Sequence, residues 1–91
     1  MNTPSNNVLV VEDNEMYRSV VVAALGHYLP GFEVAEAGSI KEAASALKAR
    51  PVSVVVVDMT LPDGTALDLI DASQGLIKQG LRVIIFSNLT K

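Results

Sequence analysis

Four consecutive valines at residues 54–57 that end in a single acid, Asp58, are the feature that most limits what this chain can fold into. An uninterrupted β-branched run is typical of a strand buried on both faces, as in the middle of a parallel sheet. A second apolar run, at residues 8–11, ends in the same way, in Glu12 and Asp13. We therefore expect two central strands that carry acidic side chains at their carboxyl ends.

Helical patterns separate the strands. Apolar residues recur at helical spacing over residues 15–29, and Asn14 or Asp13 can cap the start of this helix. Ser39 and Glu42 match a capping box at the start of a second helix. Both helices are placed where they would connect one parallel strand to the next.

The remaining chain adds a third helix and two further strands. After a Pro-Asp-Gly turn, Thr65 and Asp68 form a capping box for a helix that Gly75 weakens near its end. Apolar segments at residues 32–37 and 82–86 complete a set of four strands. Strand and helix thus alternate, which predicts an α/β fold with a parallel sheet and helices on both faces.

Composition and charge exclude several classes of function. The 91 residues suit one domain, and with 49% hydrophobic and 19% charged residues the chain has the composition of a globular protein. The net charge of −3 and the scattered basic residues give no support for binding nucleic acid or a membrane surface. The chain has no cysteine and a single histidine, which excludes thiolate chemistry and a zinc site built from these residues.

The sequence also shows no pattern typical of a signal peptide or a membrane-spanning segment. Residues 1–7 are polar and do not resemble a signal peptide, and no apolar run is long enough to cross a bilayer. We expect a cytoplasmic protein with a short flexible lead-in over residues 1–7 and one domain over residues 8–91.

The acids gather where such a fold places its ligands. In an open α/β sheet the ligand site lies beyond the carboxyl ends of the strands, where we expect Glu12, Asp13 and Asp58 to meet and Ser87 to follow the last strand. Carboxylates without histidine or cysteine are hard ligands that suit Mg²⁺. An aspartate in such a site can accept a phosphoryl group and form an acyl phosphate. Other titratable residues are assigned to a turn, a cap or the surface: Asp63, Asp68, Asp71 and His27.

The same residues resemble the receiver domain of two-component response regulators. The resemblance rests on Val-Leu-Val-Val-Glu-Asp-Asn at residues 8–14, Val-Val-Val-Val-Asp at 54–58, Leu-Pro-Asp-Gly-Thr-Ala-Leu-Asp-Leu at 61–69 and Val-Ile-Ile-Phe-Ser at 83–87. It implies a flavodoxin-like topology and a signalling domain that assists only its own phosphorylation and is not an enzyme.

The resemblance also implies a role for each site residue. Asp58 would be the phosphoacceptor, with a sensor histidine kinase or a phosphotransfer protein as the donor. Asp13 would bind Mg²⁺ directly, Glu12 would act mainly through bound water, and the backbone carbonyl of Thr60 would be a further ligand. Ser87 would supply the hydroxyl that moves toward the phosphoryl group on activation.

The sequence departs from the family pattern in several places. Asn88 stands where a small residue is usual, so we expect slower phosphoryl entry, and Ala66 stands where a glycine is usual. The family's fifth strand, with its lysine and aromatic switch residue, and its fifth helix have no counterpart, since Lys91 lies too early to be that lysine. We therefore expect an incomplete receiver that lacks the last strand–helix unit and is activated weakly. Its fourth strand, residues 82–86, would be an apolar edge through which two copies could pair.

Three other functions fit parts of the pattern. A phosphatase of the haloacid dehalogenase type needs an aspartate two residues after its nucleophile, where this chain has Thr60. A flavin-binding module needs a phosphate-binding loop after the first strand, where Glu12 and Asp13 would repel a phosphate. The alternative with most weight is a phosphorylation-impaired receiver-like module that acts by protein–protein interaction or dimerisation.

Overall fold

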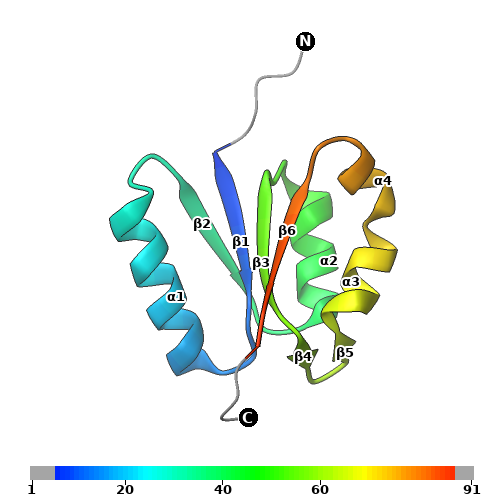
Figure 1. Ribbon diagram of the computed structural model, residues 1–91, viewed down its shortest axis with the longest axis horizontal. Coiled ribbons are helices and arrows are strands. Elements are labelled where there is room, and N and C mark those ends of the chain that lie inside the picture. The colour runs from blue at the N-terminus through cyan, green and yellow to red at the C-terminus, as the bar shows by residue number, and fades with distance from the viewer. Residues whose placement is uncertain (1–5, 88–91) are drawn as a thin grey trace.

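Four parallel strands form the centre of the computed structural model, which describes residues 6–87 (Figure 1). They are β1 (Asn7–Val11), β2 (Glu33–Ala37), β3 (Val54–Asp58) and β6 (Arg82–Phe86). The sheet has the order β2-β1-β3-β6, so β1 and β3 lie side by side at its centre. This order follows the flavodoxin-like pattern 2-1-3-4, which confirms the predicted topology for these strands.

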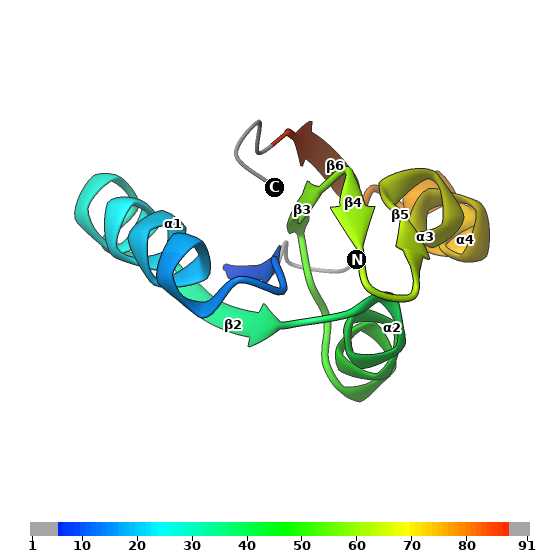
Figure 2. The same cartoon turned by 90° about the horizontal axis from the view of Figure 1, so that it is seen from below.

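Helices cover both faces of the sheet, as the sequence predicts (Figure 2). They are α1 (Glu15–Tyr28), α2 (Ile40–Ala49), α3 (Ala66–Ala72) and α4 (Gln74–Lys78). Figure 2 shows α1 on one face, while α2, α3 and α4 lie on the other. In the described part of the chain, every helix is too short or too polar to cross a membrane.

The predicted caps begin the first two helices. At the start of α1 the side chain of Asn14, and not that of Asp13, accepts a hydrogen bond from the Tyr17 amide. At the start of α2 the Ser39 hydroxyl accepts from the Glu42 amide, and Glu42 in turn accepts from the Gly38 amide. These bonds satisfy amides that have no partner within the helix, which is why the helices begin where the sequence indicates.

Two features of the chain after β3 differ from the predictions. The Pro-Asp-Gly turn is the tip of a small antiparallel hairpin formed by β4 (Thr60–Leu61) and β5 (Gly64–Thr65). The prediction of a single third helix is wrong, because the helix is interrupted at Ser73, between α3 and α4. Ser73 has φ −109° and ψ 15°, and its amide bonds to the Ile70 carbonyl in a tighter turn. Gly75, a poor helix former, lies two residues after Ser73, in α4.

The core lies mainly between the sheet and the helices α2 and α3. Leu9, Val11, Val55 and Val57 point into it from the two central strands and are fully buried. The valines of β3 predict burial on both faces of the strand. This prediction is wrong for Val54 and Val56, which are only partly buried. The reason is visible in Figure 2, where α1 covers β1 and β2 and, within residues 6–87, no helix covers the same face of β3.

Candidate functional site

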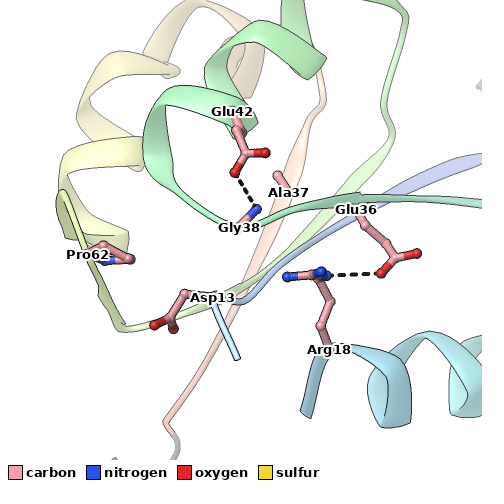
Figure 3. A pocket seen from close by; sticks show the side chains of 7 residues that line it. All are labelled: Asp13, Arg18, Glu36, Ala37, Gly38, Glu42 and Pro62. Atoms are coloured by element: carbon pink, nitrogen blue, oxygen red, sulfur yellow. Dashed lines mark hydrogen bonds and ion pairs between the residues drawn. The ribbon is translucent and has the colours of Figure 1, made fainter. Parts of the chain in front are cut away.

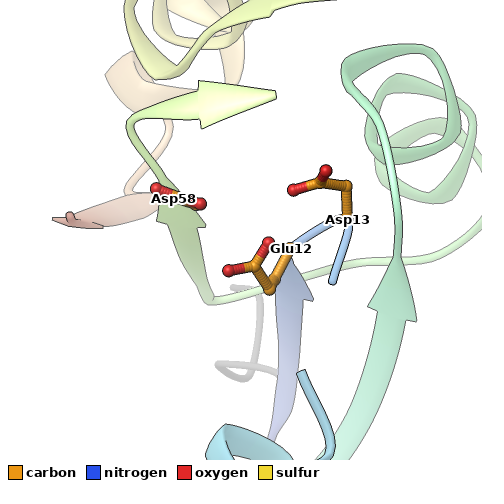
Figure 4. A group of neighbouring side chains, drawn as sticks. All are labelled: Glu12, Asp13 and Asp58. Atoms are coloured by element: carbon orange, nitrogen blue, oxygen red, sulfur yellow. The ribbon is translucent and has the colours of Figure 1, made fainter. Parts of the chain in front are cut away.

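Three carboxylates meet at the carboxyl edge of the sheet (Figure 4). Glu12 and Asp13 follow β1, and Asp58 is the last residue of β3. Each of these side chains offers an oxygen within 4.8 Å of the other two. Glu12 and Asp58 are 0% and 1% exposed, whereas Asp13 is exposed. The cluster therefore has a buried base and one side open to solvent.

The pairing of β1 with β3 produces this arrangement. The two strands are parallel and in register, with Val11 opposite Val57, so the residues that follow them emerge side by side. The backbone of Glu12 continues the ladder toward β2, because its amide donates to the Ala37 carbonyl at 3.0 Å. The sheet itself thus fixes the separation of Glu12 and Asp58, as predicted from the two apolar runs.

Polar contacts hold the segment that follows β1. The Asn14 amide donates to Glu12 Oε2 at 3.0 Å. Arg18 on α1 donates from Nη1 to the Glu12 carbonyl at 2.8 Å and from Nε to Glu36 Oε1 at 3.0 Å. Figure 3 shows this ion pair beside Asp13, at a cavity of about 480 Å³ whose lining is Asp13, Arg18, Glu36, Ala37, Gly38, Glu42 and Pro62.

Asp58 lies where the sheet passes into the β4–β5 hairpin. The Thr60 amide faces its carboxylate, with 3.4 Å between the nitrogen and Asp58 Oδ1. The Met59 amide donates to the Phe86 carbonyl of β6 at 2.8 Å, and this bond ties the start of the hairpin to the sheet. Thr60 is therefore adjacent to the acidic cluster, and its role as a backbone ligand stays a prediction.

Ser87 lies at the same edge, one residue beyond the end of β6. Phe86, its neighbour in sequence, is the register partner of Asp58, and the Ser87 side chain is exposed. The register thus brings Ser87 to the edge that carries the acids. Asn88, which the sequence predicts to slow phosphoryl entry, and Lys91, to which it assigns no role at the phosphoryl group, lie outside the described residues.

Asp63 has a role that the sequence does not reveal. Its carboxylate does not close the local turn but accepts hydrogen bonds from the backbone amides of Ile40 and Lys41, at 2.9 and 3.0 Å. These bonds to the first turn of α2 lower the pKa of Asp63 below its usual value. No local pattern could indicate this contact, because the residues that it joins are 22 and 23 positions apart.

The donor set of the cluster fits Mg²⁺. It consists of carboxylate oxygens only, and a magnesium ion prefers oxygen ligands while it keeps several of its waters. Three like charges this close together, two of them buried, are unfavourable without a compensating cation or hydrogen bonds. The exposed side, at Asp13, leaves room for water and for a further ligand.

Residues 8–91 match the sequence profile of the response regulator receiver domain. The chain belongs to this family. Its domain is thus a signalling domain of two-component systems, and both the predicted fold and the predicted family are confirmed. The acid tolerance regulatory protein ActR of Rhizobium meliloti (strain 1021) is 33% identical over 72 residues, which are 79% of this chain. The chain spans only 36% of the length of that relative.

Solved structures of receivers superpose closely on this chain. The MaeR response regulator bound to beryllium trifluoride is 26% identical, with a TM-score of 0.80 over 93% of this chain and 69% of the other. The beryllofluoride-activated NtrC4 receiver domain dimer is 30% identical, with a TM-score of 0.76 over 88% of this chain and 64% of the other.

Proposed function

We propose that this domain is a Mg²⁺-dependent phosphoacceptor and that Asp58 receives the phosphoryl group. The observation that carries the proposal is the meeting of Asp58 with Glu12 and Asp13, two strand-end acids from the neighbouring strand. The likeness to MaeR, whose structure holds beryllium trifluoride, an analogue of a phosphoryl group, supports the same role for this edge of the sheet.

Each site residue has a part in the proposed transfer. Asp13, Asp58 and the Thr60 carbonyl would hold Mg²⁺, and Glu12 would act through a water molecule. When bound, the ion supplies positive charge that offsets the negative charge of the phosphoryl oxygens. One Asp58 oxygen forms the new bond to phosphorus while the bond from phosphorus to the donor nitrogen breaks, and the released imidazole takes up a proton. The Ser87 hydroxyl donates a hydrogen bond to a phosphoryl oxygen of the product.

The donor in this proposal is the phosphohistidine of a sensor histidine kinase or of a phosphotransfer protein. Family membership supports this class of partner, because response regulators act in two-component signalling. The domain contributes the acceptor and the metal site and turns over no other substrate.

A direct labelling experiment tests the proposal. The full chain is incubated with acetyl phosphate and Mg²⁺, and intact mass is measured. We expect one added phosphoryl group that is stable in acid and lost in base, that is absent in Asp58→Asn, and that is absent when the metal is chelated. Asp71→Asn, which changes an exposed carboxylate on α3, is the matched control and should be labelled like the wild type. Labelling of Asp58→Asn would overturn the assignment.

A second function is favoured by the exposed edge of the sheet. We propose that β6 pairs with a second copy of the chain, because β6 ends the strand order within residues 6–87 and Ile84 is 54% exposed on it. The NtrC4 receiver, a relative by structure, forms a dimer.

Light scattering at increasing protein concentration tests this pairing. We expect the mean mass to rise for the wild type and to stay at that of a monomer for Ile84→Lys. A wild-type chain that stays monomeric at every concentration would count against pairing through β6. If phosphorylation fails but pairing occurs, the domain is an interaction module and not a switch.

A further inference from the structure

We propose that Asp63 is a positioning residue for the acidic site. By tying the β4–β5 hairpin to the first turn of α2, it would fix the segment that carries Thr60 next to Asp58. The inference rests on the proposed function, because it assigns Asp63 to the geometry of the metal site. It adds a residue outside the acidic cluster and a second element, α2, to that site.

The first line of evidence is the contact itself. Each oxygen of the Asp63 carboxylate accepts one backbone amide, Oδ1 from Ile40 at 2.9 Å and Oδ2 from Lys41 at 3.0 Å. These are the first two amides of α2, which have no carbonyl partner inside the helix. A carboxylate at this position also faces the positive end of the helix dipole. The next amide, that of Glu42, is satisfied separately by Ser39.

The second line of evidence is close packing between the hairpin and α2. Gly64, next to Asp63, has φ +150°, and a Cβ built on it would lie 2.7 Å from Ile40 Cδ1 and 2.6 Å from Asp68 Oδ2. The backbone of the hairpin thus lies directly against the side chain of the first residue of α2. Asp63 and Gly64 act at the same place, one by hydrogen bonds and the other by the lack of a side chain.

The third line of evidence is how the rest of the hairpin is held. Its start is bound to β6 through Met59, and its end is bound to α3, where the Thr65 amide donates to Asp68 Oδ2 at 2.8 Å. The tip between Leu61 and Gly64 meets α2 through Asp63. Thr60 pairs with Thr65 across the hairpin, so a movement of the tip is transmitted to the residue beside Asp58.

These contacts predict a specific consequence for metal binding. A site that must hold a backbone carbonyl in place depends on the residues that fix that segment, and outer residues of this kind typically change metal affinity by about 10–100-fold. Loss of Asp63 would loosen the hairpin and move the Thr60 carbonyl, whereas the three carboxylates would stay on their strands.

Two variants of the same helix end separate positioning from helix stability. Asp63→Ala and Ser39→Ala both remove acceptors from the N-terminus of α2, but only Asp63 belongs to the hairpin. Isothermal titration of the full chain with Mg²⁺ should show affinity about tenfold or more weaker for Asp63→Ala, and within about twofold of the wild type for Ser39→Ala. Asp63→Asn keeps one acceptor oxygen and should be intermediate. It also serves as the test if Asp63→Ala does not fold.

Amide hydrogen exchange provides the second measurement. Residues 60–65 should exchange faster in Asp63→Ala than in the wild type or in Ser39→Ala. Equal Mg²⁺ affinity in Asp63→Ala and the wild type, or equal losses in the two alanine variants, would overturn the inference. A wild-type chain that binds no Mg²⁺ would instead overturn the proposed function. In that case, unchanged amide exchange of residues 60–65 in Asp63→Ala would also show that Asp63 does not hold the hairpin to α2.

Discussion

On one face of the sheet, α2 and α3 bury Ala43, Leu47 and Leu69 against the central strands, whereas α1 on the opposite face contains no buried residue. On α1, Met16 and Val20 are 73% and 62% exposed. Both α1 and α2 begin with a side-chain cap, so the caps do not explain the difference in burial. What differs is the burial of the helices themselves, since the strand residues Val8 and Val10 on the α1 face are also buried.

The comparison indicates that the helices on the two faces of the sheet are buried to different extents. Burial of apolar surface, worth roughly 25 cal/mol per Å², stabilises the α2–α3 face. On the α1 face Val8 and Val10 are buried as well, and the polar contacts of Arg18 with Glu12 and Glu36 add to the support of α1. The acidic cluster lies between the segments that lead to the two faces of the sheet. Glu12 precedes α1, and Asp58 precedes the hairpin that Asp63 binds to α2.

Truncation of one apolar side chain on each face should give the largest contrast. Leu69→Ala on α3 removes a side chain that is almost fully buried, and we expect a loss of about 2–5 kcal/mol in the free energy of unfolding. Val20→Ala on α1 should change that free energy by less than about 0.5 kcal/mol. Urea denaturation followed by circular dichroism measures both. Similar losses would show that α1 is packed as firmly as α3.

Alanine substitution of one glycine beside each face should give effects of opposite sign. Gly64→Ala places a Cβ against Ile40 and Asp68 at a positive φ, and we expect a loss of more than about 1 kcal/mol. A Cβ at Gly26, inside α1, meets nothing within 4 Å, so Gly26→Ala should stabilise the chain by about 0.5–1 kcal/mol. Thermal unfolding of the two variants provides the measurement. Destabilisation by Gly26→Ala would mean that α1 has a close neighbour at that position.

Removal of the Arg18 contacts tests the polar support of α1. Arg18→Met keeps the apolar stem but loses both the bond to the Glu12 carbonyl and the ion pair with Glu36, for an expected cost of about 1 kcal/mol. Glu36→Gln removes only the charge of the exposed partner and should cost less than about 0.5 kcal/mol. The two variants are compared by urea denaturation at low and high salt. If Glu36→Gln costs as much as Arg18→Met, the ion pair and not the carbonyl bond supports the segment.

The sequence was most informative where a local pattern fixes the outcome. Strand ends, the Ser39 cap and the meeting of Asp58 with Glu12 follow from short segments combined with the rule that parallel strands end at one edge, whereas for α1 the sequence leaves Asn14 and Asp13 open as the cap. Features that depend on packing of distant segments were missed. The valines of β3 do not reveal that Val54 and Val56 are only partly covered, since that depends on where α1 lies.

The bond from Asp63 to α2 was missed for the same reason, because its partners are 22 and 23 residues away and any acid in a Pro-Asp-Gly turn looks the same from the sequence. Both of these missed features concern how the two faces are covered. The prediction that follows from Asp63 therefore contrasts the two helix starts directly.

The smallest expected effect is a dependence of stability on pH. The contacts at the start of α2 should show it, and the cap at the start of α1 should not. The pKa of Asp63 is lowered in the folded chain by the amides of Ile40 and Lys41. A group whose pKa is lower in the folded than in the unfolded state stabilises the fold above the unfolded value, about 3.9, and loses this contribution as pH falls through the folded value. The neutral cap of α1, Asn14, has no such dependence.

Urea denaturation at pH 7 and at pH 3 checks this contrast. The difference in unfolding free energy between the wild type and Asp63→Asn should shrink as the pH falls, because protonation removes the charge that the variant already lacks. The difference between the wild type and Asn14→Ala, expected to be about 1 kcal/mol, should stay the same at both pH values. If the Asp63→Asn difference does not shrink, the charge of Asp63 contributes nothing to the tether, and the close packing of Gly64 against Ile40 must hold the hairpin to α2.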